Sequence, residues 1–333
     1  MVKYFFRICS KTFISFLGIS TGLFLAIVVL FGGAIAIVGA SSQNMLVSLP
    51  DAQGKVKPLG KETPVVAVFD LKGVICPSRH SEEFFRTALA SLDKPPLTNR
   101  VKGLILKVDC PGGELFEVHR MYTLLKEWKE RTSVPVYVFI EGLCASGGYY
   151  VSCLGDKIFA SSVSLTGSVG VLTGPFFNVK DSLNRYGIKT ELLSGGKDKA
   201  PLNPFTDWDA SQKEERQKIV DFFYQSFVSL VSQHRPLLTE SKLVNSLGAR
   251  VYPPLQAKKE GFVDEINVTF NQVIQEILPK CDIAGDYRVV GICGELWWKK
   301  FMVQFQNSPL VSGRIHHQVV PSEQNTLSWY AGI

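Results

Sequence analysis

Residues 134–150 read Val-Pro-Val-Tyr-Val-Phe-Ile-Glu-Gly-Leu-Cys-Ala-Ser-Gly-Gly-Tyr-Tyr, an apolar run followed by small residues. The apolar part predicts a buried strand, and the small residues predict the start of a helix. Ser146 stands at that start, near backbone N–H groups that stabilise negative charge. Two interpretations are open from these residues alone: Ser146 is a nucleophile, or it only caps a tightly packed helix.

Segments of the same two kinds alternate on both sides of this stretch. Continuously apolar strands alternating with helices are typical of an α/β domain whose mostly parallel sheet is covered on both faces. Strands are predicted at 64–70, 103–109, 134–140 and 157–160. Helices are predicted at 81–92, where Ser81 caps the N-terminus, and at 114–131. The predicted fold class is therefore α/β.

The second half of the chain continues the pattern with weaker signals. We predict a helix at 178–186, a strand at 188–193, a long amphipathic helix at 210–233 and short helices over 238–277. The segment 294–303 predicts an amphipathic helix, which either packs on the domain or touches a membrane surface or a partner.

An uncharged stretch at 13–38 precedes the domain. Its length predicts one transmembrane helix, since a bilayer core needs about 20 apolar residues. Lys3, Arg7 and Lys11 precede it and the first charge after it is Asp51, so the N-terminus is predicted in the cytoplasm and the domain outside. A cleavable signal peptide is the alternative, although the stretch exceeds the roughly 7–15 apolar residues of such peptides.

These features divide the chain into five parts. We predict a cytoplasmic N-terminus at 1–12, the anchor at 13–38, a polar stalk at 39–62, one domain at 63–280 and an extension at 281–333.

Composition excludes several functions. The net charge of +6 comes from well-mixed acidic and basic residues, so no basic patch indicates nucleic acid. The seven cysteines have no CxxC or Cys/His metal spacing, and neither a metal nor another cofactor is expected. Cys281 and Cys293 are candidates for a disulfide in an oxidising compartment.

A serine nucleophile needs a base, and histidine is the usual one. His119, the nearest candidate, falls more than one turn into the predicted 114–131 helix and is interpreted as a packing or surface residue. Lysine also serves where desolvation lowers its pKa. Lys197 and Lys199 lie in the glycine-rich loop 194–204, which is otherwise an ordinary charged surface loop.

Gly112 and Gly113 form a third candidate element, between a predicted strand and a predicted helix. Glycines there allow close approach of the backbone to a ligand, and N–H groups at a helix start can bind an oxyanion. A simple turn explains them equally well.

The order of these motifs resembles the S49 family of serine peptidases, the signal peptide peptidase A type. Gly261-Phe-Val-Asp264 adds to the resemblance, which covers roughly residues 64–270. The four ordered motifs are Asp109-Cys-Pro-Gly-Gly-Glu114, Ala145-Ser-Gly-Gly-Tyr-Tyr150, Leu165-Thr-Gly-Ser-Val-Gly-Val171 and Ser194-Gly-Gly-Lys-Asp198.

The resemblance implies a Clp/crotonase-like fold and a Ser-Lys dyad. Ser146 matches the nucleophile, Lys197 the general base and Ser168 the residue that orients the lysine. The N–H groups of Gly113 and Gly147 are our choice for the oxyanion hole.

One departure affects the base. The loop before the lysine is a residue shorter than in many relatives, which makes Lys199 the alternative to Lys197.

The resemblance also implies a biological setting. A homo-oligomeric serine endopeptidase, anchored in a bacterial inner membrane with its catalytic domain outside the cytoplasm, would cleave apolar peptides such as remnant signal peptides. Two alternatives are a catalytically silent scaffold or peptide-binding protein of the same fold and, less favoured, an acyl-CoA lyase or hydratase.

Overall fold

The computed structural model describes residues 45–77, 82–196, 198–293 and 328–330, together with positions 22 and 25. The predicted anchor at 13–38, the cap Ser81 and the predicted base Lys197 fall outside these ranges, apart from positions 22 and 25. Within the described residues, no helix has both the length and the apolar character to cross a bilayer.

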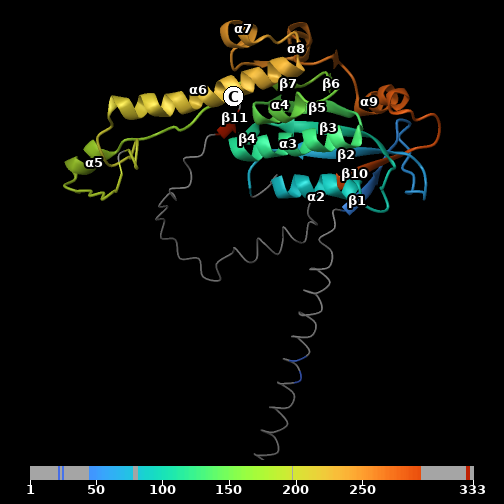
Figure 1. Cartoon of the computed structure of the whole chain (residues 1–333), viewed down its shortest axis with the longest axis horizontal. Coiled ribbons are helices and arrows are strands. Elements are labelled where there is room, and N and C mark those ends of the chain that lie inside the picture. The colour runs from blue at the N-terminus through green and yellow to red at the C-terminus, as the bar shows by residue number, and fades with distance from the viewer. Residues whose placement is uncertain are drawn as a thin grey trace, which may run out of the picture. The chain divides into compact units, whose positions relative to one another are not determined.

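The described part of the chain from residue 45 onward is built on a mixed, mostly parallel sheet (Figure 1). Its main path runs in the order β1 (Met45–Leu49), β10 (Arg288–Cys293), β2 (Val65–Lys72), β3 (Val101–Cys110), β5 (Val136–Ala145), β6 (Lys157–Ala160) and β9 (Glu265–Ile266). From β10 to β9 every neighbouring pair is parallel, whereas β1 joins the edge antiparallel to β10. The prediction of a mostly parallel α/β sheet is confirmed.

A branch of the sheet leaves at the end of β5. The strand β7 (Leu165–Gly167) pairs in parallel with the last residues of β5, and β8 (Val251–Tyr252) pairs antiparallel with β7. A separate short ribbon joins β4 (Gly112–Glu114) to β11 (Ser328–Tyr330). The branch and β4 both lie near the start of helix α4 and so build the surroundings of Ser146.

Helices cover both faces of the sheet. The bounds are α2 Glu82–Leu92, α3 Leu115–Thr132, α4 Gly147–Ser152, α5 Lys180–Arg185, α6 Ala210–His234, α7 Glu240–Lys242, η1 Leu243–Leu247, α8 Pro254–Glu260, α9 Phe270–Ile277 and η2 Leu278–Cys281. In β2, Val65 and Ala67 face the core beneath α2, α3 and α4, while Val66 and Val68 face the core beneath α9. Both faces of β2 are buried, which explains its continuous apolar sequence.

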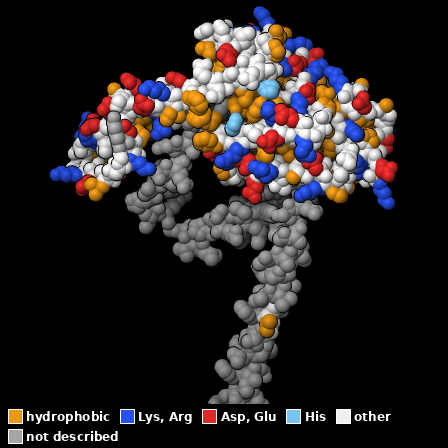
Figure 2. All heavy atoms as spheres, viewed as in Figure 1, with side chains coloured by type: hydrophobic (Ala, Val, Ile, Leu, Met, Phe, Trp, Pro, Cys, Tyr) orange, Lys and Arg blue, Asp and Glu red, His pale blue; other side chains and the backbone are white. Residues whose placement is uncertain are grey.

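An arm projects from this body, made of α5, the loop 186–209 and the N-terminal part of α6 (Figure 1). None of the residues of α5 is buried, and the buried residues of α6 are Phe227, Val228 and Val231, near its C-terminal end. The exposed start of α6, residues 210–226, extends for about 25 Å at 1.5 Å per residue. Apolar side chains also gather on the surface where the arm meets the body (Figure 2).

Two features of the sheet differ from the sequence predictions. The predicted strand at 188–193 is wrong: those residues form no strand, and Leu193 is 87% exposed. Residues 45–49 of the predicted stalk and 288–293 of the predicted extension are neighbouring strands, β1 and β10. Their pairing spans most of the chain, so the local pattern of either segment alone could not reveal it.

Candidate active site

Ser146 lies where β5 ends and α4 begins, on a sharply turned backbone. Its φ is 52° and its ψ −121°, a conformation that a non-glycine residue rarely adopts and that costs about 1–3 kcal/mol. The side chain is fully buried, and Oγ has no hydrogen-bond partner among the described residues. Nor does it make a capping bond to α4, which removes helix capping as the reason for this serine.

The Thr-Gly-Ser turn holds Ser146 in place. The Ser146 N–H donates to the Gly167 carbonyl at 3.0 Å, which continues the β5–β7 pairing of Ala145 with Gly167 by one step. Ser168 follows directly, is buried with a φ of 52°, and donates its N–H to the Arg250 backbone carbonyl at 2.8 Å. The structure therefore brings together the two serines that the sequence analysis singled out.

Gly147 and Gly113 also meet at this turn. A Cβ atom added to Gly147 would lie 3.3 Å from the Gly113 nitrogen and 2.5 Å from Val118 Cγ2. Gly113 itself sits in β4 against Ile75, whose N–H donates to Gly112 and whose carbonyl accepts from Glu114, both at 2.9 Å. Gly113 is thus required by the close approach of the Ile75 backbone, and Gly147 by the Val118 side chain, rather than by simple turn formation.

The other nucleophile and base candidates near the serine have different roles. Burial raises the pKa of the Cys110 and Cys144 thiols to about 12, so both stay protonated at neutral pH. His119 Nδ1 is hydrogen-bonded to the Tyr150 hydroxyl at 2.9 Å, a packing contact as predicted. Cys281 is a free, buried thiol beneath Gly103, and so it forms no disulfide with Cys293.

Of the two candidate lysines, only Lys199 lies among the described residues. Lys197 lies outside the described residues, and Lys199 is exposed on the loop between α5 and α6. That loop belongs to the arm, which reaches away from the sheet and α4 (Figure 1). Within the described part of one chain, the serine half of the predicted dyad is assembled without its base.

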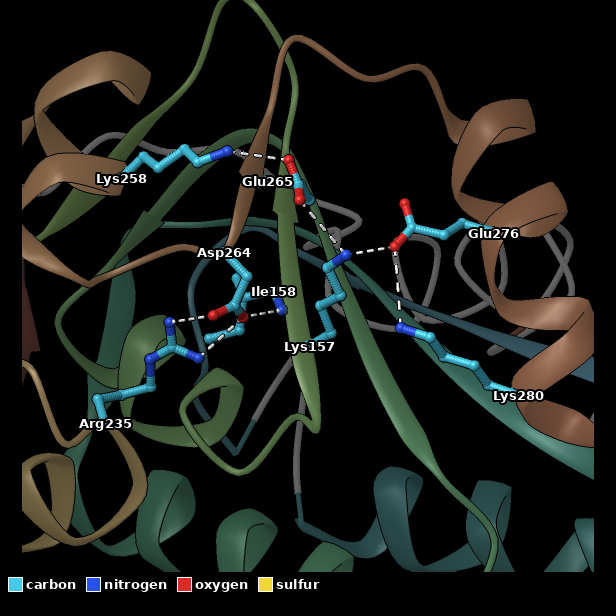
Figure 3. A network of polar contacts seen from close by, with 8 residues as sticks. All are labelled: Lys157, Ile158, Arg235, Lys258, Asp264, Glu265, Glu276 and Lys280. Atoms are coloured by element: carbon cyan, nitrogen blue, oxygen red, sulfur yellow. Dashed lines mark hydrogen bonds and ion pairs between the residues drawn. The ribbon is translucent and has the colours of Figure 1, made fainter.

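A polar network is centred on the buried Arg235 and its partner Asp264 (Figure 3). Arg235 binds both oxygens of Asp264 at 2.8 and 2.9 Å and donates to the Gly261 carbonyl at 3.0 and 3.1 Å. Asp264 also accepts the Ile158 N–H at 2.7 Å. Between them, the Phe262 carbonyl accepts the Tyr149 hydroxyl at 2.9 Å, so the network fixes α4 three residues after Ser146.

Only half of this network could be recognised in the sequence. The motif Gly261-Phe-Val-Asp264 was noted only as part of the family resemblance. In the structure, its Phe262 carbonyl holds the Tyr149 hydroxyl. Arg235 was missed, since an arginine just after a long amphipathic helix looks like an ordinary helix end. Its only local signal was the arginine's place directly after the apolar stripe of α6.

Replacing Arg235 is expected to destabilise the domain. The Arg235 side chain is 10% exposed and its partner Asp264 33% exposed. Arg235→Met leaves Asp264 and the Gly261 carbonyl without their partner and should lower the free energy of unfolding by about 3 kcal/mol.

The matched control is Lys258→Met, which removes a more exposed ion pair with Glu265 in the same view (Figure 3). It should cost less than about 0.5 kcal/mol. Urea-induced unfolding measures both, and equal losses in the two variants would contradict the role given to Arg235.

Comparison with known proteins gives this site its context. Residues 129–281 match the family model Peptidase family S49. A protein named as a protease in Methanocaldococcus jannaschii is 32% identical over 58% of this chain and 60% of its own length. A protein named signal peptide peptidase SppA in Enterococcus faecium is 30% identical over 62% of this chain and 61% of its own.

Among solved structures, a membrane-bound stomatin-specific protease is similar at a TM-score of 0.45 and 14% identity, covering 70% of this chain and 99% of that one.

Residues 129–281, which include Ser146, therefore match an S49 peptidase domain. Proteins named SppA, protease 4 and SohB are similar to this chain. The chain spans about 60% of the length of the two relatives described.

Proposed function

We propose that the chain is a serine endopeptidase with Ser146 as its nucleophile. The observation that carries this proposal is the Ser146 hydroxyl, buried without a partner among the described residues on a strained turn. An unpartnered buried hydroxyl costs about 1–3 kcal/mol, and the strained backbone adds to that cost. Two such costs at one residue favour chemistry over packing.

The proposed general base is Lys197, with Lys199 as the alternative. A lysine accepts a proton near neutral pH only where loss of water or a nearby cation lowers its pKa. The flanking residues Gly196 and Asp198 have positive φ values of 96° and 55°. Both are exposed in a single chain, so a base in this loop would need a cover that removes water from it.

A second copy of this chain is the proposed cover. The arm that carries the loop presents exposed apolar side chains, among them Tyr186, Leu193 and Phe222. Surfaces of this kind mark protein contacts. If the arm of one copy packs on the body of the next, Lys197 is desolvated and delivered to the neighbour's Ser146. A Clp/crotonase-like, ring-forming domain fits this arrangement.

The proposed oxyanion hole consists of the Gly113 and Gly147 N–H groups. They lie together beside the serine, where a negative charge develops as Oγ attacks a peptide carbonyl. Ser168, next to Ser146, is the proposed orienting group for the incoming lysine amine.

The reaction then runs in two steps. The lysine takes the proton of Ser146 Oγ as it attacks the peptide carbonyl, and gives it to the departing amine, leaving an acyl-enzyme ester. The same lysine next takes a proton from water as the water oxygen attacks the ester. It returns that proton to Ser146 Oγ as the ester bond breaks, which releases the new carboxyl group and restores the serine.

Gly113→Ala is expected to disrupt both the hole and the fold around it. Its new methyl carbon would lie 1.9 Å from the Ile75 carbonyl oxygen, so β4 must move. We expect a loss of about 2 kcal/mol in stability and a fall of about 100-fold in kcat.

In the control Gly60→Ala, the methyl carbon would meet side-chain atoms alone, the Thr63 hydroxyl oxygen at 2.9 Å and the Arg288 guanidinium at 3.9 Å. Thermal unfolding and peptide-cleavage rates compare the two variants, and normal cleavage by Gly113→Ala would exclude this oxyanion hole.

Apolar peptides are the proposed substrates, such as signal peptides left in the membrane. Phe116, at the start of α3 just after β4, is 47% exposed and contacts Phe223 on α6 with ring centroids 6.4 Å apart. These aromatic side chains beside β4 provide an apolar surface for a peptide. We propose the setting implied by residues 13–38: a single-pass protein of a bacterial inner membrane, with the N-terminus in the cytoplasm and the domain outside.

Labelling with a serine-reactive fluorophosphonate tests the proposal. Labelling of the full chain at Ser146, identified by mass spectrometry and absent in Ser146→Ala, is expected. A chain that stays unlabelled would instead favour the silent scaffold. A reporter fused after Ile333 tests the topology, and a cytoplasmic signal would contradict the extracytoplasmic placement and revive the acyl-CoA alternative.

A further inference from the structure

The last described strand of the chain pairs with the strand that carries Gly113. Residues 328–330 form β11, antiparallel to β4, and the register sets Trp329 opposite Gly113, Ser328 opposite Glu114 and Tyr330 opposite Gly112. Figure 1 shows β11, in red, beside β4. The end of the chain thus adds a strand at the candidate active site.

The Gly113 N–H and carbonyl point toward the edge of β4 on which β11 lies. Ile75 already binds the Gly112 carbonyl and the Glu114 N–H on one edge. Because backbone groups alternate in direction along a strand, the Gly113 N–H and carbonyl point to the opposite edge. The opposite edge is where β11 lies.

We propose that residues 328–330 occupy the position of a peptide substrate and inhibit their own chain. This inference rests on the proposed function, since it takes the Gly113 N–H as an oxyanion donor. A substrate peptide that pairs with this edge of β4 would bind by the same backbone hydrogen bonds. It must therefore displace β11 to reach Gly113. The tail therefore acts as a tethered competitor, which raises the apparent KM and leaves kcat unchanged.

The pairing provides a matched pair of substitutions in the full chain. Trp329 lies opposite Gly113, so its N–H points toward β4, whereas the Ser328 N–H points away. Proline removes the N–H, and only Trp329→Pro therefore removes a bond of the ribbon.

We expect Trp329→Pro to lower the apparent KM for an apolar reporter peptide about tenfold, the equivalent of one or two backbone bonds. Ser328→Pro should stay within about twofold of the wild type, because proline is tolerated where a strand N–H points away from its partner.

Hydrogen exchange of the Gly113 amide gives a readout that needs no catalysis. In the Ser146→Ala background, the amide should be protected with the natural tail and with Ser328→Pro, and should exchange faster with Trp329→Pro. Unchanged Gly113 exchange and unchanged KM in Trp329→Pro would overturn the inference. An inactive wild type whose Gly113 protection still depends on Trp329 would contradict the proposed peptidase and leave the tail pairing supported.

Discussion

Ser146→Ala is expected to abolish peptide cleavage while leaving the fold at least as stable as the wild type. Loss of the nucleophile should lower kcat/KM by roughly 10⁴-fold or more. Ser146 Oγ has no hydrogen-bond partner among the described residues. Its removal therefore ends the cost of burying an unbonded hydroxyl and should raise the free energy of unfolding by about 1 kcal/mol.

Ser152→Ala is the matched control on the same helix. Ser152 is also buried, but its hydroxyl donates to the Gly148 carbonyl at 2.7 Å. Removing it should cost about 1 kcal/mol of stability and change kcat/KM by less than about threefold.

The two alanine variants should therefore move activity and stability in opposite ways. Urea unfolding and steady-state cleavage of one apolar peptide measure both quantities. A Ser146→Ala protein that cleaves at the wild-type rate, or that loses as much stability as Ser152→Ala, would show that the serine is a structural residue.

The core strands and the serine turn could be predicted because their causes are local. A strand buried on both faces is apolar along its whole length, and β2, β3 and β5 are readable for that reason. A tight strand-to-helix turn needs small residues, which marks Ser146 and Gly147. These features require no knowledge of distant parts of the chain.

The remaining features depend on contacts between distant segments. The strands β1 and β10 form only when residues 45–49 pair with residues 288–293, which lie far away in the sequence. Likewise, Arg235 gains its role only through Asp264. The segment 188–193 shows the reverse error: it was predicted to be a strand, but its described residues form none. An exposed segment with apolar residues and a true strand can look alike in a short stretch of sequence.

Two inactive variants, Ser146→Ala and Lys197→Met, are expected to regain activity when they are produced together. The arm that carries the lysine loop projects from the body that carries Ser146, and its exposed apolar residues include Leu193 at 87% exposure. In a ring in which each arm serves the next subunit, a site works only when its serine comes from a Lys197→Met subunit and its lysine from a Ser146→Ala subunit. Random mixing should give about a quarter of wild-type activity.

The result depends on where the dyad forms. If each chain completed its own site, every subunit of the mixture would lack one member of the dyad, and the mixture would remain inactive. Co-production of Ser146→Ala with Lys199→Met tests the alternative base: recovery with Lys199→Met, combined with full activity of Lys197→Met alone, would move the base to Lys199. Native mass spectrometry shows whether the two variants have formed mixed oligomers. If mixed oligomers of Ser146→Ala and Lys197→Met form and remain inactive, the lysine is not delivered by a neighbouring subunit, because such a lysine would restore activity at the intact serine that it reaches.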